Sequence, residues 1–140
     1  MKDKNFAAKM VYSSFFMSNF IYAGIALYFF QNFYTKHIFL AGSFPKETFL
    51  LLRMVLAGIS IFELFPLIYL INKRNTAENS QKWNLYFYSS LGISASVSIY
   101  ALFLILLTSG QAIRTFFIFL GLGTFYLLIA WPKFPDKISN

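Results

Sequence analysis

Residues 48–71, TFLLLRMVLAGISIFELFPLIYLI, decide the fold of this chain because they are long, continuous and almost wholly apolar. A helix of about 21 residues is roughly 32 Å long, which matches the roughly 30 Å hydrocarbon core of a bilayer. Inside hydrocarbon the backbone must satisfy its own hydrogen bonds, so we expect this stretch to be a transmembrane helix. Glu63 lies deep within it, where an ionisable group is energetically costly and points to a function.

Three further apolar stretches, at 10–30, 84–107 and 112–131, have similar lengths. Of the 140 residues, 58% are hydrophobic and 12% are charged, whereas soluble domains carry roughly 25% charged residues. The sequence therefore predicts an all-α protein, a four-helix transmembrane bundle of two antiparallel helical hairpins in one integral membrane domain. The expected parts are a hairpin at 10–71, a cytoplasmic connector at 72–82, a hairpin at 83–131 and a short tail at 132–140.

The basic residues predict the orientation of the chain in the membrane. Eight of the twelve Lys and Arg residues lie in the N-terminus, the second loop and the C-terminus, and four lie on the opposite side. By the positive-inside rule we expect both termini in the cytoplasm, in a bacterial inner membrane. Trp83 and Trp131 then fall at the cytoplasmic interface, where indole rings are enriched. A signal peptide is the alternative for the first stretch, but its apolar region is longer than a typical signal, and we expect it to be retained.

The loops between the helices differ in character. The first loop is aromatic and apolar and is expected to lie along the membrane interface. Its apolar residues are Phe33, Tyr34, Ile38, Phe39, Leu40 and Phe44. The third loop is expected to be a tight turn around Ser109 and Gly110.

The composition disfavours several functional classes. The chain has no cysteine, which excludes disulfides and thiolate metal sites, and its single His37 excludes a bis-histidine haem. It has no Ser–His–Asp set, paired carboxylates, phosphate-binding loop or metal-ligand spacing, so we expect no enzyme, no metal and no cofactor. The net charge of +7 is explained by basic residues at helix ends, and we expect no nucleic-acid partner.

The candidate ion-binding site centres on Glu63. One interpretation is a carboxyl group that binds and releases a proton or a small cation; the other is a permanently protonated side chain that only joins two helices. Pro66 has no N–H group for the carbonyl of Phe62, which leaves an unpaired carbonyl beside the carboxyl group. Asn19 and Tyr22 lie near the middle of the first helix. In an antiparallel hairpin Asn19 would reach Glu63, and a backbone carbonyl is its alternative partner.

Small residues at helical spacing predict close packing of helices, within the chain or between copies. The positions are Ser14 and Ser18 in the first helix and Gly92, Ser94, Ser96 and Ser98 in the third.

A weak internal repeat relates the two expected hairpins. Tyr-Ser-Ser at 12–14 recurs at 88–90, and Arg53 and Arg114 occupy matching places near the starts of the second and fourth helices. Both arginines are expected to extend to the membrane interface. Counted from Arg114, Thr124 takes the place of the buried acid. Chance similarity in so biased a composition is the alternative explanation.

The sequence around the acid resembles the ion-carrying outer helix of the proteolipid, or c, subunits of rotary ATPases. The residues that carry the resemblance are Glu63, Pro66, Leu67, Tyr69, Leu70 and Ile71. The small residues at 92–98 are similar to the glycine-rich inner helix of that family, and two related hairpins match its vacuolar-type members. The resemblance implies that Glu63 carries H⁺ or Na⁺ within an oligomeric ring, against an arginine of a separate stator subunit. Unlike that family, the chain lacks a glycine run in its first helix, has its acid in the first hairpin and has the opposite expected orientation.

Two other functions stay open. The chain is either a structural or accessory protein of a larger membrane complex, with Glu63 as a link between helices, or a small dimeric transporter whose site also centres on Glu63. In every case the expected partners are the lipid bilayer and either further copies of the chain or other membrane subunits.

Overall fold

The computed structural model describes residues 2–36 and 45–133, and these residues form helices joined by short turns. The helices are α1 (Lys2–Phe29), the π-helix η1 (Phe30–Tyr34), α2 (Lys46–Asn75), α3 (Ser80–Leu107) and α4 (Ile113–Ile129). No strand occurs in the described ranges. The predicted all-α fold with four main helices is confirmed.

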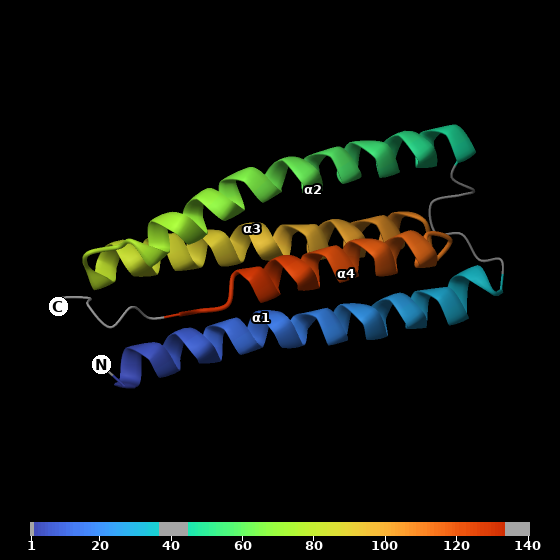
Figure 1. Ribbon diagram of the computed structural model, residues 1–140. Helices are drawn as coiled ribbons and strands as arrows, with labels where there is room; N and C mark the ends of the chain where they lie inside the picture. Colours follow the sequence, from blue (N-terminus) through green and yellow to red (C-terminus); the bar gives the residue numbers. More distant parts are fainter. Residues whose placement is uncertain (1, 37–44, 134–140) are drawn as a thin grey trace.

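The four helices alternate in direction, and α1 begins at the end of the bundle where α4 ends (Figure 1). The central helix is α3, which packs most extensively against α4 and α2 and also contacts α1. The second partner of α1 is α4, and α2 makes only a small contact with α4. In Figure 1, α1 and α2 lie on opposite sides of the α3–α4 pair. The expected pairing of the first hairpin is therefore not confirmed, because α1 packs on α3 and α4.

Three of the helical segments are long and apolar enough to cross a membrane: Phe6–Tyr34, Glu47–Asn75 and Ser80–Leu107. They support an integral membrane protein. The fourth expected span is shorter than predicted, since α4 has 17 residues. At 1.5 Å per residue it is about 26 Å long, somewhat less than a hydrocarbon core of about 30 Å.

The polar connector predicted at 72–82 is mostly helical. Helix α2 continues to Asn75 and α3 begins at Ser80, so only four residues lie between the two helices. Asn79 caps α3, because its side-chain oxygen accepts a hydrogen bond of 2.8 Å from the backbone N–H of Lys82. The basic residues at the end of α2 suit the negative end of its helix dipole, which explains why the polar sequence stays helical.

The α3–α4 turn agrees with its prediction. Ser109 and Gly110 both have positive φ, at 49° and 91°. A Cβ atom on Gly110 would lie 2.8 Å from Cα of Phe30 in η1, so the turn also needs the absence of a side chain here. In the first loop, η1 continues α1 and the N–H of Thr35 bonds the carbonyl of Phe30 at 3.1 Å. The remaining residues of that loop, His37, Ile38, Phe39, Leu40 and Phe44, lie outside the described residues.

Two of the predicted small residues of α3 bring it close to α4. Ser94 and Ser98 are buried, and a Cβ atom on Gly123 of α4 would collide with the hydroxyl of Ser98 and lie 3.0 Å from its backbone nitrogen. The predicted close approach is therefore present between α3 and α4. By contrast, Gly92 has nothing within 4 Å of its Cβ position, and Ser14 is exposed. For these two positions a contact between copies stays a prediction.

The remaining serines of the predicted packing set bond locally. The hydroxyls of Ser14 and Ser18 donate to carbonyls of their own helix, Met10 and Phe15 respectively. Ser18 is half-buried and makes no hydrogen bond to another helix in the described part of the chain. Ser96 faces α2, where its hydroxyl bonds Glu63.

Two side chains hold the end of α4. Arg74 of α2 is only 2% exposed and donates hydrogen bonds to the carbonyls of Ala130 and Trp131, at 2.8 and 3.0 Å. Trp83 is fully buried and donates to the carbonyl of Lys133 at 3.3 Å. The expectation of Trp83 at the lipid interface is therefore corrected: its ring fills the space between α3 and the segment after α4. Trp131 is 45% exposed, as an interfacial residue would be.

Candidate functional site

The carboxyl group of Glu63 points from α2 toward α3 and accepts hydrogen bonds from two hydroxyls. Tyr100 donates to Oε1 at 2.7 Å, and Ser96 donates to Oε2 at 2.9 Å. Ser96 and Tyr100 are one helical turn apart, so they lie on the same face of α3. Short O–H···O contacts of this kind are strong when the acceptor is a carboxylate.

Ser96 has a second acceptor, which gives the site two hydrogen-bonding arrangements. Its Oγ lies 2.9 Å from Glu63 and 2.6 Å from the carbonyl oxygen of Ile93. A serine hydroxyl carries one proton and two lone pairs. It therefore donates to Glu63 when the carboxyl group is charged. When the carboxyl group is protonated, the same hydroxyl accepts from it and donates to Ile93.

The outer side of Glu63 opens on a shallow apolar groove of α2. The groove is lined by Gly58, Ile59, Phe62, Glu63 and Pro66. The ring of Phe62 is 75% exposed, and Glu63 itself is half-buried. Phe62, Glu63 and Pro66 thus share one surface, as their spacing predicts. Helix α2 continues through Pro66, whose missing N–H leaves the carbonyl of Phe62 without its usual helical donor.

No cationic side chain neutralises the carboxyl group within the described residues, where its recorded partners are the two hydroxyls. Arg53, on the same helix, is ten residues away, or about 15 Å along the axis.

A second tyrosine links α2 to α4 next to the site. Tyr126 is buried, and its hydroxyl donates to the carbonyl of Ser60 at 2.8 Å. Ser60 precedes Glu63 by one helical turn and donates to the carbonyl of Leu56. This bond holds the segment of α2 that carries the acid against the bundle. Sequence reasoning did not single out Tyr126 or assign Tyr100 to Glu63, although the matched spacing of Ser96 and Tyr100 was the available signal.

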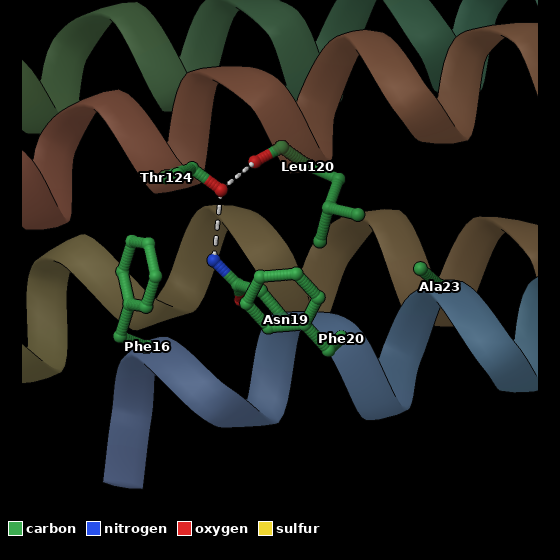
Figure 2. A pocket seen from close by; sticks show the side chains of 6 residues that line it. All are labelled: Phe16, Asn19, Phe20, Ala23, Leu120 and Thr124. Carbon is green, nitrogen blue, oxygen red and sulfur yellow. Dashed lines mark hydrogen bonds between the residues drawn. The ribbon is translucent and has the colours of Figure 1, made fainter. Parts of the chain in front are cut away.

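Asn19 lies away from Glu63, between α1 and α4. Its Nδ2 donates to Oγ1 of Thr124 at 2.9 Å, and Thr124 donates to the carbonyl of Leu120 at 2.8 Å (Figure 2). The two residues border a hollow of about 270 Å³ whose other lining is apolar. The expected hydrogen bond from Asn19 to Glu63 is therefore corrected, because α1 packs on α3 and α4, whereas Glu63 lies on α2. Tyr22 packs against the apolar core and has no recorded hydrogen bond in the described structure.

Chemically, the Glu63 site offers one carboxyl group and two hydroxyls. In the described ranges no three His, Asp or Glu side chains come together as metal ligands would. Divalent cations such as Mg²⁺ and Ca²⁺ take six or more oxygen ligands, whereas a proton needs one acceptor. The two carboxyl oxygens and two hydroxyls of the site are fewer ligands than these divalent cations take.

No protein-family model, curated protein or solved structure matches this chain. The resemblance to proteolipid subunits therefore stays a prediction from the sequence around Glu63 and in α3.

Proposed function

We propose that this chain is an integral membrane protein that binds and releases a proton at Glu63, as an ion-translocating subunit of a larger membrane assembly. The observation that carries the proposal is the shared hydroxyl of Ser96, 2.9 Å from the carboxyl group and 2.6 Å from the carbonyl of Ile93. A site that has to change its charge needs hydrogen-bond partners in both states.

Both protonation states of Glu63 are satisfied without movement of the backbone. In the charged state Tyr100 and Ser96 each donate to one carboxylate oxygen. In the neutral state the proton on Oε2 is donated to Ser96, whose own proton turns to Ile93, while Tyr100 keeps its bond. Because only hydroxyl rotation is required, the exchange involves little reorganisation of the protein.

The position of the site also supports transport. The groove beside Glu63 is on the outer face of α2, away from the centre of the bundle, where a neighbouring subunit can reach it. Phe62 and Pro66 give this groove apolar walls. The resemblance to proteolipid subunits implies the same arrangement, in which another subunit contacts an acid on the lateral surface.

Carbodiimide labelling tests the proposal, because carbodiimides react with protonated carboxyl groups in apolar surroundings. The protein in mild detergent is treated with a hydrophobic carbodiimide over a pH series, and labelled residues are located by peptide mass spectrometry. We expect labelling of Glu63 that decreases as the pH rises. Glu47, an exposed carboxyl group near the start of α2, is the internal control for a water-exposed acid. If Glu63 stays unlabelled at every pH that preserves the helices, the proposal is rejected.

The accessory role is the second candidate, and the same hydrogen bonds favour it, since they tie α2 to α3. The substitution Glu63→Gln separates the two functions. Glutamine has a carbonyl that accepts one hydroxyl and an amide that donates to the other, so the helix contact is kept. A proton carrier would assemble normally in this variant and lose proton transport, whereas a structural link would keep both assembly and function.

A further inference from the structure

A hollow of about 390 Å³ lies at the end of the bundle opposite the chain's start, far from Glu63. Its lining residues come from η1, the beginning of α2, the α3–α4 turn and the beginning of α4. These elements lie at the same end of the bundle in Figure 1. Its polar lining residues are Tyr34, Arg53, Gln111, Arg114 and Thr115. Two helices that are distant in sequence thus bring two guanidinium groups to one hollow.

No acidic side chain balances the charge of this hollow among the residues that the structure describes. Arg53 and Arg114 are both exposed, and neither makes a recorded hydrogen bond or ion pair within the described residues. The segment 37–44, HIFLAGSF, contains no acidic residue. Glu47 is the one acid on the adjoining part of α2, and it lies six residues, or about 9 Å along the axis, from Arg53. Two unpaired guanidinium groups in one concavity attract an anion.

Other groups of the hollow suit an anion that carries oxygens. Helix α4 begins here without a side-chain cap. The N–H group of Ile113 bonds the carbonyl of Gly110 at 3.3 Å, and the N–H groups of the next residues and the positive end of the α4 dipole face this end of the bundle. Gln111 and Thr115 add neutral donors, and Tyr34 adds a phenol. Phe30, Phe49 and Ile113 form an apolar wall beside them. Planar guanidinium groups match the geometry of phosphate oxygens, with two parallel hydrogen bonds from one side chain.

We propose that this hollow binds a phosphate group, held by Arg53 and Arg114 together. The phosphate belongs either to the headgroup of an anionic phospholipid, whose glycerol and acyl chains would lie on the apolar wall, or to a soluble phosphate compound. The proposal is independent of Glu63, because the two sites share no residue.

Binding to the full-length protein in mild detergent tests the proposal. Three probes are titrated and followed by native mass spectrometry: short-chain phosphatidylglycerol, short-chain phosphatidylcholine and inorganic phosphate. The test variant is the double substitution Arg53→Gln and Arg114→Gln. Its matched control, Lys73→Gln and Lys82→Gln, removes the same charge from exposed positions at the opposite end of the bundle. All four side chains are exposed, so both variants are expected to fold.

For the anionic probe that the wild type binds, we expect the dissociation constant of the arginine variant to be at least about tenfold higher than that of the wild type. The lysine variant is expected to bind this probe like the wild type. Binding of phosphatidylglycerol in preference to phosphatidylcholine, with no binding of inorganic phosphate, identifies a lipid headgroup as the source. Saturable binding of inorganic phosphate identifies a soluble phosphate. The proposal is overturned if the wild type saturates with neither anionic probe, or if the two double variants bind alike.

Discussion

Asn19 of α1 donates a hydrogen bond of 2.9 Å to Thr124 of α4, the residue that the internal repeat matches to Glu63. In the repeat α1 corresponds to α3 and α4 to α2, with Thr124 matching Glu63. The contact of α1 with α4 is thus the counterpart of the contact of α3 with α2. In both contacts a polar side chain near the middle of one helix bonds a side chain of the other helix. Only the contact between α3 and α2 contains an acid, Glu63. The repeat itself stays a prediction, because its offset matches Asn19 to Ala95 and not to Ser96 or Tyr100.

The substitution Tyr100→Phe is expected to weaken the contact between α2 and α3. It removes the hydroxyl that donates to Oε1 of Glu63 at 2.7 Å, and we expect a loss of about 1 kcal/mol in unfolding free energy, the usual size for such bonds in membrane proteins. Titration with dodecyl sulfate, followed by circular dichroism, measures it. Tyr88→Phe, at a tyrosine that is 48% exposed, is the control. Equal stability of the two variants would show that the Tyr100 bond contributes nothing.

The substitution Gly123→Ala is expected to destabilise the bundle by about 1–3 kcal/mol, since overpacking forces helices apart. The new methyl group would collide with the hydroxyl of Ser98 in α3. Gly121→Ala is a matched control in the same helix, because nothing lies within 4 Å of its Cβ position. That control is expected to be neutral or slightly stabilising, by up to about 1 kcal/mol, through helix propensity. Thermal unfolding in detergent compares them, and a control less stable than Gly123→Ala contradicts the prediction.

The substitution Arg74→Met is expected to loosen the end of α4. It removes two hydrogen bonds and leaves the carbonyls of Ala130 and Trp131 without these donors, at a cost of about 2 kcal/mol or more. Hydrogen exchange of residues 126–133 should accelerate. Lys73→Met, at the exposed neighbouring position, should leave exchange unchanged.

A lysine at position 74 tests the geometry of the same contact. Lysine keeps the charge but lacks the planar guanidinium group that reaches both carbonyls. Residues 126–133 of the Arg74→Lys variant should therefore be protected from hydrogen exchange better than in Arg74→Met and less well than in the wild type. Full protection in the lysine variant would mean that charge alone holds the end of α4.

The substitution Gly110→Ala is expected to displace η1 from the α3–α4 turn. An alanine at φ 91° is strained, and its Cβ atom would lie 2.8 Å from Cα of Phe30. A cost of about 1–3 kcal/mol follows from the backbone strain. Gly92→Ala is the control, because its Cβ position is open. A thermal scan in detergent measures both, and we expect the Gly110 variant to unfold at a clearly lower temperature.

Local rules account for the features that were predicted correctly. The helical fold follows from hydrocarbon as a solvent, which demands internal backbone hydrogen bonds along any long apolar stretch. The turn follows from Gly110, which adopts positive φ without steric cost, and from Ser109, because serine is common in turns. The close approach of α3 to α4 at Ser94 and Ser98 follows from their small size and spacing of four. Each of these three features depends only on residues that are close together in the sequence.

The partners of buried polar groups were not predictable in the same way. Sequence spacing places Asn19 and Glu63 at similar depth, but depth does not say how a helix is rotated or which helix lies next to it. Arg74 was counted only as a charge in a loop, yet it is buried against the end of α4. Trp83 was assigned to the lipid interface by residue type, yet packing inside the protein buries it completely.

The sequence by itself determined that this chain is a set of long apolar helices with one carboxyl group inside them, because the length and polarity of a segment control how it meets a membrane. Only the tertiary structure decided that the acid bonds to α3 through Ser96 and Tyr100, and that Arg53 and Arg114 meet at one hollow. These contacts depend on how the helices are rotated and packed against one another. Helix packing joins side chains that are far apart in the sequence, so the local sequence around each residue does not determine it.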